Sequence, residues 1–255
     1  MNLKKLLLVA ILVLAVCLVA CDDKKKNKPK VVDDTDPYSQ TVSAEVLDAY
    51  KAKIEEIEKK HKEEQAKLLE DPDFDIASLT NLKYDLVYFN DDDIPELVVT
   101  NEGFAVALYT YANGQVVYTM QDEGITDENG WTYGIAGNGG YDYVSKGNVI
   151  RNYNNEYAGL IRYVTYNKLD DKTNQLVPVY DNSLKEYHFN DKNNNGEIDE
   201  DEADDYVDEP TAFYFGENKI TEEEYNAKLI DGDYDILDGD LTATKMIEKF
   251  ESLKK

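Results

Sequence analysis

The segment at residues 191–202, DKNNNGEIDEDE, places oxygen-bearing side chains at alternating positions around a glycine. An EF-hand loop needs side-chain oxygens at positions 1, 3 and 5, glycine at position 6, a backbone carbonyl at position 7, an oxygen at position 9 and a bidentate glutamate at position 12. The segment fills every position, and the ligand candidates are Asp191, Asn193, Asn195, Glu197, Asp199 and Glu202. The spacing predicts a calcium site, with a solvated acidic loop as the alternative.

The candidate ligands of this loop are hard oxygens, so its composition favours Ca²⁺ over zinc or copper. Three ligand carboxylates and no obvious partner loop predict modest affinity, with a Kd of about 0.1 to 1 mM. The preceding LKEYHF suits a strand as well as a helix, and Ala203, Tyr206 and Val207 follow at helical spacing. We expect a lone EF-hand-like loop whose calcium is mainly structural, and we expect His61 and His188 to be packed or surface residues rather than ligands.

A second acidic stretch, YFNDDDIPELVV, leads into an apolar run that suits a buried strand. It resembles a motif, roughly D-x-D-G-D-G-I-P-E-L, of a broad group of Gram-positive bacterial surface lipoproteins that has no established activity. The matching residues are Asn90, Asp92, Ile94, Pro95, Glu96 and Leu97. Tyr88 replaces the first aspartate, and Asp91 and Asp93 replace glycines, so the chain departs from the metal-binding pattern. We expect a structural turn at residues 90–96.

The N-terminal sequence MNLKKLLLVAILVLAVCLVAC has two lysines before an apolar stretch that is short for a membrane span. Residues 18–21, LVAC, look like the lipobox of bacterial lipoproteins, whose cysteine thiol takes a diacylglyceryl group. We therefore expect residues 1–20 to be a signal peptide and Cys21 to anchor the protein on the extracytoplasmic face of the cell membrane, with a retained membrane helix as the alternative. Removal of Cys17 would leave no thiol pair for a disulfide.

The formal net charge of −26 becomes −28 if the signal peptide is removed with its two lysines and no acids. Such a charge repels phosphate backbones, so we expect no nucleic-acid partner. Residues 21–41 are polar, contain two prolines and have no apolar periodicity, which is typical of a tether. Residues 42–255 then form the folded domain, with no repeat at a fixed period.

A long helix is predicted to begin after Ser43, a good N-cap, and to end before Pro72. Alternating spacings of three and four give it one stripe, made of Leu47, Tyr50, Ile54, Ile57, His61, Glu64 and Leu68. The polar members of this stripe favour packing on the protein's own sheet over a coiled-coil dimer. We accordingly expect a monomer.

Short β-rich runs follow from residue 82, and Asn113-Gly114 suits a tight hairpin turn between two of them. Thr221 with Glu224 is typical of a capping box, and a last helix is predicted at residues 242–253 after an acidic loop at 231–240. The order of these elements predicts an α+β fold: a long N-terminal helix packed on a mainly antiparallel β-sheet, an EF-hand-like loop and C-terminal helices. The resemblance to the lipoprotein group extends over the helix, the hairpin and this capped helix.

No catalytic motif accompanies these elements: G-x-S-x-G, H-E-x-x-H and a glycine-rich phosphate loop are all missing from the sequence. We therefore expect no enzyme activity, although the many acids leave open a cell-wall-acting hydrolase with paired carboxylates. The other alternative is a surface module for a cell-wall glycan or peptide, with a stacking surface made of Trp131, Tyr133, Tyr141 and Tyr143. A hairpin whose aromatic side chains pack inward would explain the same residues.

Overall fold

The computed structural model has the α+β architecture that the order of predicted elements indicates. All described residues lie within the compact unit Asp34–Lys255. They are residues 36–71, 79–101, 105–120, 125–126, 132–133, 139–193, 195–199, 202 and 206–254. The predicted signal peptide and most of the predicted tether lie outside them.

The long helix α2, Ala44–Leu68, begins where its sequence indicates. Ser43 is the N-cap, and its Oγ accepts the backbone N–H of Val46 at 3.3 Å. The N-terminal part of the predicted stripe is buried, whereas Leu68 at the far end is 47% exposed. The helix thus packs through its first turns, and its C-terminal part extends beyond the core.

Sheet A is antiparallel and consists of six strands in the order β1-β2-β3-β6-β5, with β4 also pairing with β3. The predicted hairpin joins β3 to β4, where both Asn113 and Gly114 have positive φ, as a two-residue hairpin turn of type I′ requires. The strands are β1 Leu82–Val87, β2 Glu96–Asn101, β3 Ala105–Ala112, β4 Gln115–Tyr118, β5 Ile125–Thr126 and β6 Thr132–Tyr133.

Sheet B is also antiparallel and has eight strands in the order β13-β12-β11-β9-β8-β7-β14, with β10 pairing with β9. A single 3-10 turn, η2 Tyr157–Gly159, joins its two longest strands. The strands are β7 Gly140–Val144, β8 Val149–Glu156, β9 Ile161–Asp170, β10 Gln175–Pro178, β11 Leu184–Tyr187, β12 Ala212–Phe215, β13 Asn218–Ile220 and β14 Tyr234–Ile236. The short helix α3, Glu222–Asn226, has the predicted capping box of Thr221 and Glu224.

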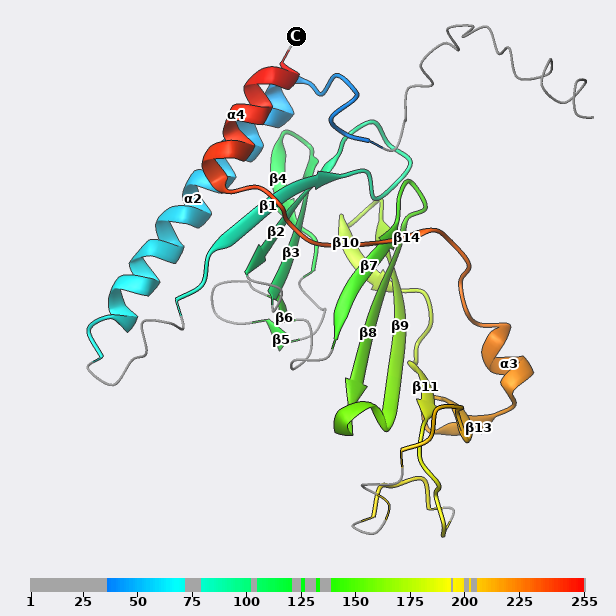
Figure 1. Ribbon diagram of the computed structural model, residues 1–255. Coiled ribbons are helices and arrows are strands. Elements are labelled where there is room, and N and C mark those ends of the chain that lie inside the picture. The colour runs from blue at the N-terminus through cyan, green and yellow to red at the C-terminus, as the bar shows by residue number, and fades with distance from the viewer. Residues whose placement is uncertain are drawn as a thin grey trace, which may run out of the picture. The chain divides into compact units, whose positions relative to one another are not determined.

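Two apolar cores lie on opposite faces of sheet A, one under the helices and one between the two sheets. Figure 1 shows the helices on one side of sheet A and sheet B on the other. Neighbouring residues of a strand point to opposite faces, so Val99 joins the core under the helices and Val98 joins the core between the sheets. This double burial explains the unbroken apolar run of β2. The sequence predicted a helix-covered sheet but not a second sheet against its other face.

The segment after α3 connects the two sheets (Figure 1). The sequence predicted an acidic loop at residues 231–240, and this prediction was wrong in part, because β14 pairs with β7 there. Leu237 is buried between the sheets, and Leu241 forms an antiparallel bridge with Tyr84 of β1. Backbone pairing therefore fixes this acidic segment across both sheets.

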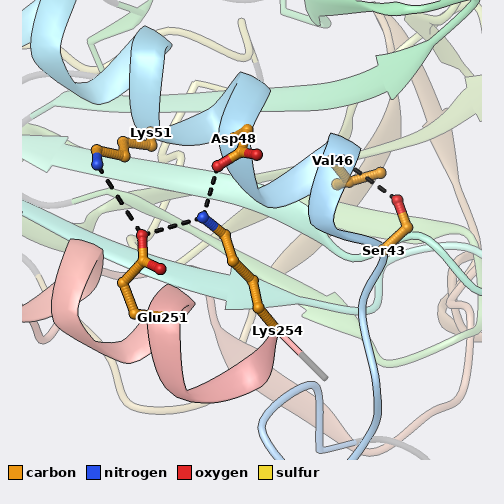
Figure 2. Close-up of polar contacts among 6 residues, drawn as sticks. All are labelled: Ser43, Val46, Asp48, Lys51, Glu251 and Lys254. Carbon is orange, nitrogen blue, oxygen red and sulfur yellow. Dashed lines mark hydrogen bonds and ion pairs between the residues drawn. The ribbon is translucent and has the colours of Figure 1, made fainter.

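The last helix, α4 Ala243–Leu253, lies beside α2 and completes the helical layer. Met246, Phe250 and Leu253 are buried against α2 and sheet A. Figure 2 shows polar contacts at this junction, where Lys254 Nζ lies 2.5 Å from Asp48 Oδ1 and 3.0 Å from Glu251 Oε1. Solvent surrounds these ion pairs, so we assign the stability of the junction mainly to the buried apolar side chains.

In the part of the chain that the structure describes, no helix is both long and apolar enough to cross a membrane. Tyr38, which the sequence assigns to the tether, packs against the core beneath the helices. The packed part of the protein therefore starts before residue 42.

Candidate metal centre

The loop at residues 191–202 lies between β11 and β12 of sheet B. Phe189 forms an antiparallel bridge with Tyr206 across its base, and Thr211 Oγ1 donates to the carbonyl of Phe189 at 2.5 Å. The chain thus enters the loop from a strand, one of the two arrangements that the sequence allows. The helix predicted after the loop is not formed at Tyr206 and Val207, because this stretch pairs as extended backbone; residues 203–205 lie outside the described residues.

The first half of the loop is folded around its own side-chain oxygens. Asp191 accepts two backbone N–H groups: Oδ1 from Asn195 at 3.1 Å and Oδ2 from Gly196 at 2.9 Å. Asn193 Oδ1 also accepts the N–H of Asn195 at 3.0 Å, and Asn195 Oδ1 accepts the N–H of Glu197 at 2.8 Å. These bonds turn the side chains at positions 1, 3 and 5 to the inside of one bend.

The middle of the loop is held against sheet B. Gly196 has φ of 77°, a left-handed conformation that glycine adopts without steric cost. Its carbonyl accepts the hydroxyl of Tyr187 at 2.9 Å. Ile198, at position 8, packs against the apolar cluster that contains Tyr187 and Phe189. The glycine makes the bend, and the apolar contact fixes it to the sheet.

Glu202 closes the loop from its far end. It is 1% exposed, and its two carboxylate oxygens accept different backbone N–H groups: Oε1 from Lys192 at 2.6 Å and Oε2 from Asp199 at 3.2 Å. The side chain at position 12 therefore joins the second residue of the loop to the ninth. It reaches inward in the direction that a bidentate ligand must take.

Asp199 accepts the side-chain amides of the two asparagines. Its Oδ2 lies 2.6 Å from Asn193 Nδ2 and 3.1 Å from Asn195 Nδ2. These N–H donors supply the positive partial charge that a cation would otherwise offer to the carboxylate. Rotation of the two amides would withdraw these donors and turn their carbonyl oxygens toward Asp199, and it would break the bonds that those oxygens accept from the N–H groups of Asn195 and Glu197.

The donor set fits a hard divalent cation in type and number. Six loop residues offer side-chain or backbone oxygens, and calcium takes about 6 to 8 oxygens at about 2.3 to 2.6 Å. Among the described residues, however, no three side chains of His, Cys, Asp or Glu come together closely enough to hold a metal ion. Calcium coordination therefore requires the carboxylates of Asp191, Asp199 and Glu202 to move closer together as the side-chain amides of Asn193 and Asn195 rotate.

The second acidic stretch, residues 90–96, forms a turn that its own side chains close. Asp92 accepts the N–H of Ile94 at 2.8 Å, while Asn90 accepts the N–H of Asp92 and donates to the Asp92 carboxylate. Tyr50 of α2 donates its hydroxyl to the carbonyl of Pro95 at 2.8 Å. The side chains that would coordinate a metal here hold the turn together instead.

Glu96, the last polar residue of this turn, is fully buried in sheet A. Its Oε2 accepts the N–H of Phe89 at 2.9 Å, and its Oε1 accepts the hydroxyl of Thr110 at 3.3 Å. Burial, reinforced by the nearby charge of Asp92, raises the pKa of Glu96 to about 8 despite these hydrogen bonds. A carboxyl with a pKa of about 8 is mostly protonated at neutral pH, and Glu96 is a buried structural residue of this turn.

The four aromatic residues proposed as a stacking surface do not form one in the described part of the chain. Tyr141 is 1% exposed and Tyr143 is 9% exposed, and both belong to the core between the sheets. The speculative assignment of these two as ligand-facing rings was wrong, and the alternative of aromatic side chains packed inward holds for them, because their strand β7 turns them into the core. Tyr133 lies in β6 with its side chain outside the description, and Trp131 and Cys21 lie outside the described residues.

The two histidines make hydrogen bonds to nearby backbone and side-chain groups. His188 is 1% exposed, and its ring nitrogens lie 3.2 Å from the carbonyl of Val207 and 3.2 Å from Glu186 Oε2. His61 Nε2 lies 3.0 Å from the carbonyl of Thr80. These contacts pair both ring nitrogens of His188 and the Nε2 atom of His61 with neighbouring protein groups.

Comparisons with protein-family models, with curated proteins and with solved structures gave no match to this chain.

Proposed function

We propose that this protein is a lipid-anchored extracytoplasmic calcium-binding protein in which one calcium ion staples the loop at residues 191–202 to sheet B. The observation that carries the proposal is the set of loop oxygens at EF-hand spacing, folded around Gly196 and closed by Glu202. Calcium would bind Asp191, Asn193, Asn195, Asp199 and Glu202 through side chains and Glu197 through its carbonyl.

The metal has a structural role in this proposal. The loop joins two adjacent strands of sheet B, and Ile198 ties it to the cluster of Tyr187 and Phe189. An EF-hand sensor acts by opening a groove between two helices, whereas here the loop follows a strand and its base is an antiparallel bridge. Filling such a loop orders this end of the sheet without exposing a groove.

A calcium titration of the full chain tests the metal site, with heat and melting temperature as readouts and magnesium as the competing ion. We expect one saturable site with a Kd of about 0.1 to 1 mM and a rise in melting temperature. Glu202→Gln should abolish that rise, because the amide cannot supply two anionic oxygens. Glu209→Gln, which changes an exposed carboxylate outside the loop, is the matched control. An unchanged calcium response in Glu202→Gln would refute the assignment.

The proposed anchor rests on the sequence of residues 1–21 alone. It is tested separately by incorporation of labelled fatty acid in a bacterial host, where Cys21→Ser should remove both the label and the membrane association. Label that persists in this variant would contradict the lipid anchor and would leave the calcium proposal untouched.

A further inference from the structure

A cleft of about 470 Å³ lies between the N-terminal segment, β1 and α4, well away in sequence from the calcium loop. Its size is within the range of about 300 to 1,000 Å³ that small-molecule sites occupy. Charged and aromatic side chains from distant parts of the chain line it: Tyr38, Asp85, Asp240, Lys245, Glu248 and Lys249.

Tyr38 contacts an acidic residue, Asp85, through its hydroxyl and a basic residue, Lys249, through its ring. Its hydroxyl donates to Asp85 and accepts the backbone N–H of Leu86 at 3.2 Å. The ammonium of Lys249 lies 4.6 Å from the centre of the Tyr38 ring, over its face. A cation–π contact of this kind positions the lysine without neutralising it.

The opposite charges of the cleft do not pair with one another. In the described part of the chain, the ion pairs of α4 are made by Glu251 and Lys254, and none joins Lys245 or Lys249 to a carboxylate of the cleft. Burial raises the pKa of the Asp85 carboxyl, the hydrogen bonds from Tyr38 and Leu86 lower it, and the carboxylates of Asp240 and Asp238 raise it. Among the described residues no ion pair places a cation at Asp85 or Asp240, while two ammonium groups stand on α4.

We propose that this cleft binds a small molecule that carries both an amine and a carboxylate, such as a free amino acid or a short peptide. The amine lies toward Asp85 and Asp240, and the carboxylate lies toward Lys245 and Lys249. A ligand with both charges satisfies both sides, whereas a ligand with one charge meets repulsion on the other side. Glu248 of α4 adds a third carboxylate to the lining, against two ammonium groups, so a ligand with a second amine binds more tightly than one with a single amine.

Calorimetry on the full chain at fixed calcium concentration tests this with four probes of similar length. Lysine and 6-aminohexanoate carry both charges, cadaverine carries only amines, and hexanoate carries only a carboxylate. We expect saturable binding of lysine, weaker binding of 6-aminohexanoate, and little or no binding of the other two. Lys249→Gln and Lys245→Gln should each weaken lysine binding by at least about tenfold, as the loss of a charged partner does.

Lys59→Gln, on the exposed surface of α2, is the matched control and should bind lysine as the unchanged protein does. Lys245 is exposed, so its variant tests the cleft without risk to the core. No saturable heat with lysine, equal binding of cadaverine or hexanoate, or full affinity in both lysine variants would overturn the proposal. None of these results bears on the calcium site, whose titration is a separate measurement.

Discussion

The acidic loops at residues 90–96 and 191–202 both contain a buried glutamate that accepts backbone N–H groups, yet they differ in what their other oxygens do. In the first loop, Asn90 and Asp92 bond to each other and to the turn, and Glu96 lies in the core of sheet A. In the second, Asp191, Asn193 and Asn195 also accept backbone N–H groups of their own loop, whereas the Asp199 carboxylate accepts the side-chain amides of Asn193 and Asn195. The difference lies in one carboxylate: Asp92 accepts a backbone N–H of its turn, whereas Asp199 accepts side-chain amides, which a cation would replace in the proposed calcium site.

The largest expected effect concerns the two buried glutamates. Glu96→Ala should lower the free energy of unfolding by about 2 to 4 kcal/mol at neutral pH, because it leaves a cavity and the Phe89 N–H without an acceptor. Its calcium-induced rise in melting temperature should remain, in contrast to Glu202→Gln. Chemical denaturation with and without calcium measures both. Loss of the calcium response in Glu96→Ala would break the distinction between the loops.

A second expectation follows from the pKa of Glu96, which is about 8 in the folded protein against an ordinary value of 4.5. Between these two pH values the folded state binds more protons than the unfolded state, so stability falls as pH rises, by up to about 1.4 kcal/mol per pH unit. This contribution is fully present below about pH 4.5 and is lost by about pH 8. Denaturation across this range should show a shallower fall in Glu96→Gln, which keeps an acceptor but cannot titrate. An identical pH profile in the variant would contradict the assignment of a neutral Glu96.

The smallest expected effect separates backbone strain from metal binding. Gly196→Ala should cost about 1 kcal/mol, since an L-residue in the left-handed region is strained, and it should also weaken calcium binding. Gly114→Ala is the control, because its φ of 82° is similar and open space surrounds the site, while it lies in the β3–β4 hairpin. We expect a similar loss of stability there with unchanged calcium affinity. If both variants bind calcium equally well, the bend at Gly196 is not needed to arrange the ligands.

Much of the local structure could be predicted from the sequence, because its causes lie within a few residues. The Ser43 N-cap, the Asn113-Gly114 hairpin and the Thr221–Glu224 capping box are confirmed, and each depends on contacts between near neighbours. The same holds for the bend at Gly196 inside the acidic loop. The metal itself stays a prediction.

The burial of Tyr141 and Tyr143 has a longer-range cause. Aromatic residues among glycines suit an open stacking surface or a packed hairpin, and the sequence favours the hairpin without showing what the rings pack against. Only the placement of β7 opposite sheet A, which involves residues far apart in the chain, turns their rings into the core. The second sheet was also missed, although the unbroken apolar run of β2 is the pattern of a strand that is covered on both faces.

The sequence by itself determined the elements, the spacing of the loop oxygens and the charge of this protein, because local propensity and side-chain chemistry act at short range. The tertiary structure alone decided which acids are buried and which side chains they meet. Asp85 meets Tyr38 across 47 residues, and Lys249 approaches the same ring from the last helix. The spacing of residues along the sequence does not predict these contacts, because they follow from the packing of the N-terminal segment, β1 and α4 around a shared core.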